Sequence, residues 1–170
     1  MKTNVVKNDS VFALRSDYQR VLWIVSIDPH DIGSCRAGWM RITGLHHVTA
    51  ITRDLDAITS FYRDTLGLAL VQQETNADDD QARHFWFGDA EGSAGTLVSF
   101  LEYAELEPQP AGAGGLHHFA LAVDSADELG AWVDYLRSRG VEVTDVLDRG
   151  RFRSVYLRDP DGRIVEIAQR

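Results

Sequence analysis

The feature that most constrains the fold is an internal repeat. A strand, a helix and three further strands are predicted in that order over residues 40–106, and the same order recurs over residues 114–170. Each pass opens on a pair of histidines, His46-His47 in the first and His117-His118 in the second. Self-similarity of this kind indicates two copies of one supersecondary unit. The sequence therefore predicts an α+β domain built from two βαβββ units.

Start and stop signals support both predicted helices. Asp54 can cap the first helix, and Gly67 ends it. The second begins with the capping box Ser125-Ala-Asp-Glu128 and ends at Gly140. Strands are expected at residues 46–52, 68–74, 84–88 and 96–103 in the first unit, and at residues 117–123, 141–147, 152–158 and 164–169 in the second.

The composition fits one domain preceded by an extension. A chain of 170 residues with 44% apolar content can bury one core and is too short for two ordinary domains. Residues 1–39 show no sustained periodicity and are expected to be an appendage or sequence upstream of a start at Met40. The patterned domain is therefore expected to span residues 40–170.

Charge and cysteine content exclude several classes of protein. A formal net charge of -9 argues against nucleic-acid and anionic-membrane partners, which need clustered lysine and arginine. The early apolar run 21–27 is too short to cross a bilayer. The single cysteine, Cys35, excludes an internal disulfide and fits a reducing cytoplasm.

Strand alternation selects the residues that share a face with each candidate ligand. His118 lies on a face with small alanines, which leaves room beside it. The turn Asp159-Pro-Asp-Gly162 predicts a hairpin whose register puts Tyr156 opposite Glu166. A glutamate on a half-buried hairpin needs a partner, because an unpaired buried carboxylate is costly.

Two imidazoles and one carboxylate from different strands form a set that binds a divalent metal and leaves positions open. His47, His118 and Glu166 are the candidate ligands, because the two histidines are equivalent in the repeat. Each has a plainer interpretation. Either histidine alone could be an ordinary strand-end residue, and Glu166 could pair with Arg163 or Arg170. His84 is interpreted as a structural or cavity-lining residue.

These residues resemble the vicinal oxygen chelate superfamily, which includes glyoxalase I, fosfomycin-resistance thiol transferases, bleomycin-binding proteins and extradiol dioxygenases. The resemblance covers about residues 40–170 and implies that the two βαβββ units form one cupped mixed sheet with helices on its convex side. It also implies a metal held by His47, His118 and Glu166.

Within that superfamily the chain looks most like the hydroquinone type of ring-cleaving dioxygenase. The matching stretches are residues 44–51, 84–89, 115–120 and 148–156. The resemblance implies five further site residues, which are His46, Thr49, His117, Arg149 and Tyr156. A histidine expected upstream in catechol-cleaving relatives is absent, and Arg149 lies in that region, which favours a para-diol substrate.

The resemblance implies Fe(II), with Mn(II) or Zn(II) as alternatives, and an aromatic diol and dioxygen as substrates. Ser99 stands where glyoxalase I has a fourth ligand, which favours a three-ligand site. A lyase or isomerase, a thiol transferase and a non-catalytic drug- or aromatic-binding protein are the alternatives. Hydroquinone-type enzymes have about twice as many units, so the site would close within this chain or across a homodimer.

Overall fold

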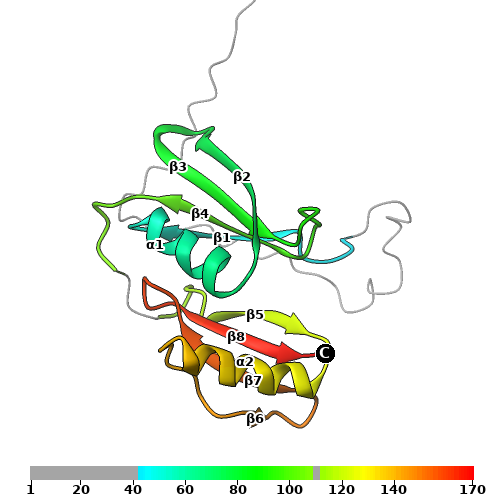
Figure 1. Cartoon of the computed structure of the whole chain (residues 1–170). Helices are drawn as coiled ribbons and strands as arrows, with labels where there is room; N and C mark the ends of the chain where they lie inside the picture. The colour runs from blue at the N-terminus through cyan, green and yellow to red at the C-terminus, as the bar shows by residue number, and fades with distance from the viewer. Residues whose placement is uncertain (1–41, 109–111) are drawn as a thin grey trace, which may run out of the picture. The chain divides into compact units, whose positions relative to one another are not determined.

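The computed structural model describes residues 42–108 and 112–170 of the chain (Figure 1). The extension expected at residues 1–39 lies outside these residues. Residues Gly44–Arg170, which include both repeat units, form a single body by their contacts. Within the described residues no helix is long and apolar enough to span a membrane.

The first repeat unit forms a four-stranded mixed sheet in the order β1-β4-β3-β2, with β1 parallel to β4. Asp54 caps the helix as predicted, because its carboxylate accepts the backbone N–H groups of Asp56 and Ala57. The helix changes from α to π geometry at Ser60, and Gly67 then turns the chain with a positive φ. The elements of the first repeat unit are β1 (His47–Thr52), α1 (Leu55–Thr59), η2 (Ser60–Thr65), β2 (Ala69–Asn76), β3 (Asp79–Gly88) and β4 (Leu97–Glu102).

The second unit repeats this plan with the strand order β5-β8-β7-β6. Its helix starts at the predicted capping box, where the Ser125 side chain accepts the N–H of Glu128. Figure 1 shows α2 lying along this sheet. The elements are β5 (His118–Val123), α2 (Ala126–Ser138), β6 (Leu147–Asp148), β7 (Arg153–Arg158) and β8 (Ile164–Gln169).

The prediction of an α+β fold with two βαβββ units is confirmed. The eight strands form two separate four-stranded sheets, however, where the resemblance implied one cupped sheet. The strands β1 and β5 each lie at an edge of their own sheet and pair with one neighbour in the chain, β4 and β8 respectively. A single joined sheet would require these edge strands to find further partners.

The second unit differs from the prediction at residues 141–147. Only an isolated bridge between Val143 and Leu157 and the two-residue strand β6 form there. The Thr144 hydroxyl accepts the backbone N–H of Tyr156, so a side chain takes the place of a backbone carbonyl in the ladder. Val141 and Val143 alternate with polar residues as in a strand, and both pack against the core. They do so without belonging to a continuous strand.

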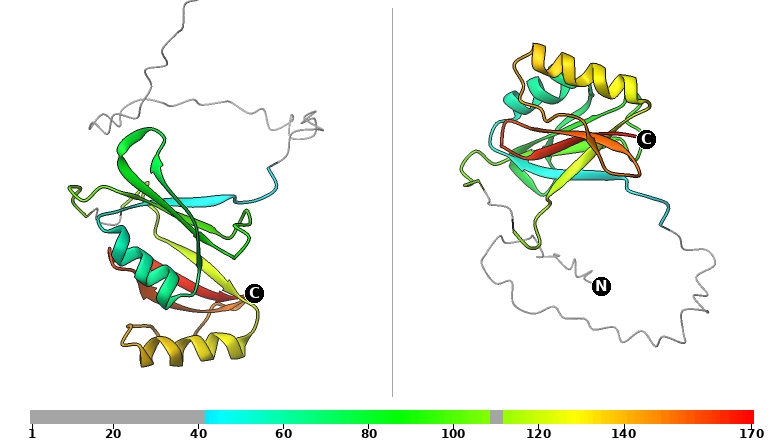
Figure 2. Two further views of the ribbon diagram at one scale, coloured as in Figure 1. Left: turned by 45° about the horizontal axis from the view of Figure 1, so that its top comes forward. Right: turned by 90° about the horizontal axis from the view of Figure 1, so that it is seen from below.

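Both units share one hydrophobic core. The Tyr62 ring lies 4.8 Å from Phe100 in the first sheet and 6.4 Å from Phe119 in the second. In both views of Figure 2 the teal α1–η2 helix lies beside the red strand β8. The Tyr62 hydroxyl donates to the buried Asp159 carboxylate just before β8, at 3.1 Å. The two units are therefore held together through the helix of the first.

The predicted hairpin between β7 and β8 is confirmed. The N–H of Asp159 donates to the Arg163 carbonyl at 3.0 Å, and Gly162 adopts the positive φ that the turn requires. The register pairs Tyr156 with Glu166. Arg163 forms an ion pair with Asp159 and also donates to the carbonyl of Ile51, so this turn also holds the two units together.

Candidate metal centre

The second unit brings two of the predicted ligands into contact. His118 opens β5 and Glu166 lies on β8, which runs parallel to it. His118 Nε2 lies 3.0 Å from Glu166 Oε2, and the glutamate side chain is only 4% exposed. The other carboxylate oxygen accepts the Tyr156 hydroxyl at 2.7 Å. Both oxygens of this buried carboxylate are therefore satisfied, as its burial requires.

His117 contacts its neighbour although strict strand alternation would separate the two side chains. The Nδ1 atoms of His117 and His118 lie 2.7 Å apart, so one of them carries the shared proton. This is feasible because β5 begins at His118, and His117 lies before the pleat is established. The contact engages His118 Nδ1 and leaves Nε2 directed at Glu166, so His117 takes the place that a carboxylate, carbonyl or water usually has beside a metal-binding histidine.

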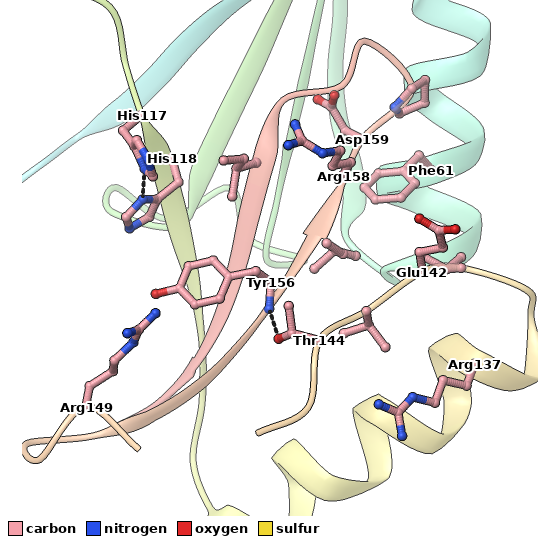
Figure 3. A pocket seen from close by; sticks show the side chains of 15 residues that line it. Phe61, His117, His118, Arg137, Glu142, Thr144, Arg149, Tyr156, Arg158 and Asp159 are labelled. Atoms are coloured by element: carbon pink, nitrogen blue, oxygen red, sulfur yellow. Dashed lines mark hydrogen bonds between the residues drawn. The ribbon is translucent and has the colours of Figure 1, made fainter. Parts of the chain in front are cut away.

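Arg149 and Tyr156 complete this side of the site. The Arg149 guanidinium lies 5.2 Å from the centre of the Tyr156 ring, and that ring meets His118 edge to face at 5.7 Å. Figure 3 shows the Tyr156 ring between His118 and Arg149. A guanidinium with N–H donors at this place is suited to bind an anionic oxygen.

These residues open onto a cavity of about 1210 Å³. His117, His118, Arg149 and Tyr156 line it together with apolar side chains that include Val143 and Ile164. Its volume exceeds the roughly 300–1,000 Å³ of ordinary small-molecule pockets, and polar groups converging in an apolar wall are typical of such sites. The cavity can accept an organic molecule of aromatic size.

The first unit holds an equivalent histidine without the carboxylate. His46 Nδ1 and His47 Nδ1 lie 2.9 Å apart, which repeats the contact of His117 with His118. Ser99 pairs with Thr49 in the ladder, and the two hydroxyls are hydrogen-bonded at 2.9 Å. In the second unit the corresponding pair is Ala120 and Glu166. The first unit thus offers one imidazole ligand and a hydroxyl pair where the second has its glutamate.

The two half-sites lie on faces that point away from the shared core. Phe100 and Phe119 face that core, whereas His47 and His118 lie at alternate positions on the opposite faces of their sheets. Within residues 42–108 and 112–170, no three His, Cys, Asp or Glu side chains come close enough together to hold a metal ion. One chain therefore brings His118 and Glu166 together and holds His47 apart from them.

Sequence reasoning missed the surroundings of His47. The Trp86 ring lies 4.9 Å from the His47 ring and 4.7 Å from the His84 ring. The Glu74 carboxylate accepts the indole N–H at 3.0 Å. Burial lowers the pKa of His84, and its Nε2 has no hydrogen-bond partner among the described residues. Trp86 opposes Ser99 as Tyr156 opposes Glu166, so the repeat itself carried a signal for this residue.

The donor set fits a divalent metal ion. An imidazole nitrogen and a carboxylate oxygen already converge in the second unit, and a second imidazole would complete the two-histidine, one-carboxylate set. The neighbours of each histidine engage Nδ1 and leave Nε2 for coordination.

The fold and this pair of half-sites define a class of proteins. Residues 44–167 match the model of the Glyoxalase/Bleomycin resistance protein/Dioxygenase superfamily, and the chain belongs to that family. It is 33% identical over 129 residues to the protein named "Putative ring-cleaving dioxygenase MhqO" of Bacillus subtilis. The matched residues make up 75% of this chain and 40% of that protein.

Two further comparisons show relatives of different kinds. The crystal structure of a Bacillus subtilis protein described as a "putative dioxygenase" superposes with a TM-score of 0.70 at 32% identity, covering 75% of this chain and 40% of that chain. The Listeria monocytogenes fosfomycin resistance protein FosX is 26% identical over 128 residues, which make up 74% of this chain and 89% of that protein. The chain thus spans about two fifths of the length of its Bacillus relatives.

Proposed function

We propose that this protein is a metal-dependent ring-cleaving dioxygenase for a hydroquinone- or catechol-like aromatic diol. The observation that carries the proposal is the His118–Glu166 pair, with Tyr156 bonded to the carboxylate and Arg149 beside the phenol ring. The relative named "Putative ring-cleaving dioxygenase MhqO", at 33% identity, supports the same reaction class. The basic residue Arg149, where catechol-cleaving relatives have a histidine, favours the para-diol.

His47, His118 and Glu166 would hold the metal, with Fe(II) preferred over Mn(II) or Zn(II). When bound, Fe(II) supplies the redox chemistry with dioxygen that amino-acid side chains lack. Arg149 would stabilise negative charge on a substrate oxygen, and the Tyr156 hydroxyl would keep the Glu166 carboxylate in place. His117 or His46 would accept a phenolic proton when its ring turns away from the neighbouring ligand histidine, because in the present contact its Nδ1 accepts the N–H of the histidine that would hold the metal.

The complete site requires a second copy of the chain. The edge strands β1 and β5 carry His47 and His118 on faces directed away from the shared core. In a symmetric homodimer, His47 of one copy would complete the site that begins with His118 and Glu166 of the other. Each dimer would then hold two equivalent sites.

Oxygen uptake tests the reaction. The protein is loaded anaerobically with Fe(II), and consumption of dissolved oxygen is followed with methylhydroquinone and with catechol. The proposal is supported if oxygen uptake requires Fe(II), is faster with methylhydroquinone than with catechol, and is lost in Glu166→Gln. Glu105→Gln is the matched control, because it makes the same chemical change in an exposed residue that does not line the cavity. Absence of uptake with every diol would overturn it.

A second candidate is a metal-dependent lyase, isomerase or thiol transferase on the same fold. The similarity to FosX favours it, because the matched residues make up 89% of that protein and so correspond to a chain of this size. Activity with Mn(II), Ni(II) or Zn(II) and without oxygen consumption would distinguish it. A non-catalytic binding protein would instead hold an aromatic ligand equally well after His47→Ala or Glu166→Ala.

A further inference from the structure

We infer that Trp86 is a positioning residue for His47, and that Glu74 holds Trp86 in place. The inference rests on the proposed function in one respect only, which is that His47 is a metal ligand. It assigns a role to two residues of the first unit that lie outside the triad and outside the five residues around it.

Trp86 lies between two imidazoles. Its ring contacts His47 at 4.9 Å with an interplanar angle of 65°, and His84 at 4.7 Å with an angle of 42°. His47 itself is exposed at the start of β1, where the backbone alone would leave its side chain free to change rotamer. The indole on one side and His46 on the other limit the His47 ring to one orientation.

The indole is itself fixed at its polar end. Its N–H donates to Glu74 Oε1 at 3.0 Å, and the Gln72 amide donates to Glu74 Oε2 at 2.8 Å. His84 Nδ1 lies 3.5 Å from the same Glu74 Oε1. A chain of contacts therefore runs from β2 through β3 to the histidine on β1, and each link is made by a side chain on the same face of the sheet.

The second unit has the same device at the equivalent place. Tyr156 lies beside His118 as Trp86 lies beside His47, and each aromatic polar group donates to a glutamate, Glu166 and Glu74 respectively. The ladder registers make the two aromatic positions equivalent. An aromatic ring tied to a carboxylate thus accompanies the candidate ligand histidine in both units.

Core packing does not explain this tryptophan. The core of the first sheet is built from Phe87, Val98 and Phe100, which lie on the other face. Trp86 is half-buried among histidine, glutamate and glutamine side chains. Orientation of a ligand by its neighbours changes metal affinity by roughly 10- to 100-fold in other metal sites, so the effect is measurable.

The test measures Mn(II) affinity by chelator competition in the full chain, without oxygen or substrate. Trp86→Leu is expected to weaken binding about tenfold, with Trp86→Phe in between because it keeps a ring and loses the N–H. Glu74→Gln keeps an acceptor and is expected to match the unmodified protein, whereas Glu74→Ala is expected to follow Trp86→Phe. Trp132→Leu, a half-buried tryptophan on α2, is the matched control.

A second measurement addresses positioning directly. In the metal-free protein the His47 ring protons should show an upfield or downfield ring-current shift that disappears in Trp86→Leu, with His47→Ala used to assign them. Unchanged Mn(II) affinity and unchanged His47 resonances in Trp86→Leu would overturn the inference. So would equal Mn(II) affinity in His47→Ala and the unmodified protein. If the Trp86 variants weaken Mn(II) binding as expected but the Fe(II)-loaded protein consumes no oxygen with any diol, the proposed dioxygenase function fails and the positioning role of Trp86 stands.

Discussion

At the scale of single residues, each candidate ligand has two polar atoms, and a hydrogen bond between a neighbouring side chain and one of them orients the other. His118 uses Nδ1 for His117 and presents Nε2 to Glu166, and Tyr156 binds the remaining carboxylate oxygen. Each group therefore has one atom fixed by a neighbour and one directed at the site. Loss of a fixing neighbour should alter function while the fold is kept.

Tyr156→Phe tests this at one hydroxyl. The change removes the donor that holds the Glu166 carboxylate in place, so kcat for diol-dependent oxygen uptake is expected to fall about 10- to 100-fold. The ring keeps its contact with His118, and thermal stability should change little. Tyr135→Phe, an exposed tyrosine on α2, controls for the loss of a phenol hydroxyl elsewhere. Equal kcat in both variants would contradict the assigned role.

The residue-level contacts divide into predictable and unpredictable ones. The pairing of Tyr156 with Glu166 could be predicted, because the hairpin loop fixes the register of β7 and β8. The contacts of His46 and His117 could not, because both residues precede the strands and escape their alternation. Glu74 was missed because β2 shifts register against β3 between Leu70 and Gln72, which the sequence pattern does not reveal. Trp86, in contrast, could have been predicted from its equivalence to Tyr156 in the repeat.

At the scale of elements, the first helix is tied to its sheet by one carboxylate. Glu102 on β4 accepts two bonds from Arg83 on β3, each at 2.7 Å, and the N–H of Leu55 at the start of α1 at 3.0 Å. The bonds from Arg83 lower the pKa of Glu102. The ionised form is therefore bound more favourably in the folded state than in the unfolded chain.

Glu102→Gln is expected to lower the free energy of unfolding by about 1 kcal/mol at pH 7, since half-exposed Arg83 is partly screened by solvent. Because the folded pKa is depressed, this contribution is present above the unfolded carboxyl pKa of about 4.3 and is lost as pH falls through the folded value. Urea unfolding at pH 7 and below pH 4 measures it. Exposed Glu105→Gln is the control, and a difference that persists in acid would count against the ion-pair account.

Element prediction succeeded where local signals and burial agreed, as for the helix capped by Asp54. It failed for residues 141–147, where the Thr144 hydroxyl replaces a ladder bond that alternation alone would assign to the backbone. The separation of the strands into two sheets is a tertiary property, because it depends on Tyr62, Phe100 and Phe119 packing across both units. The strand patterns within each unit do not indicate whether the two units form one sheet or two.

At the scale of the whole molecule, the account requires two chains for each complete site. Mixing His47→Ala with Glu166→Ala protein, each inactive alone, should restore activity after subunit exchange to about a quarter of the unmodified level, since half the dimers would be mixed and each would have one intact site. Oxygen uptake before and after exchange measures this. Sites closed within single chains would give no recovery.

His47, His118 and Glu166 are proposed to hold one divalent metal ion, and the iron content of single variants measures whether each of them does so. The protein and its three single alanine variants are loaded with Fe(II) under anaerobic conditions, desalted and analysed for iron. The account predicts about one iron per chain in the unmodified protein and near-complete loss in each variant, with unfolding transitions retained. Iron content that is equal in the unmodified protein and in all three variants would contradict it.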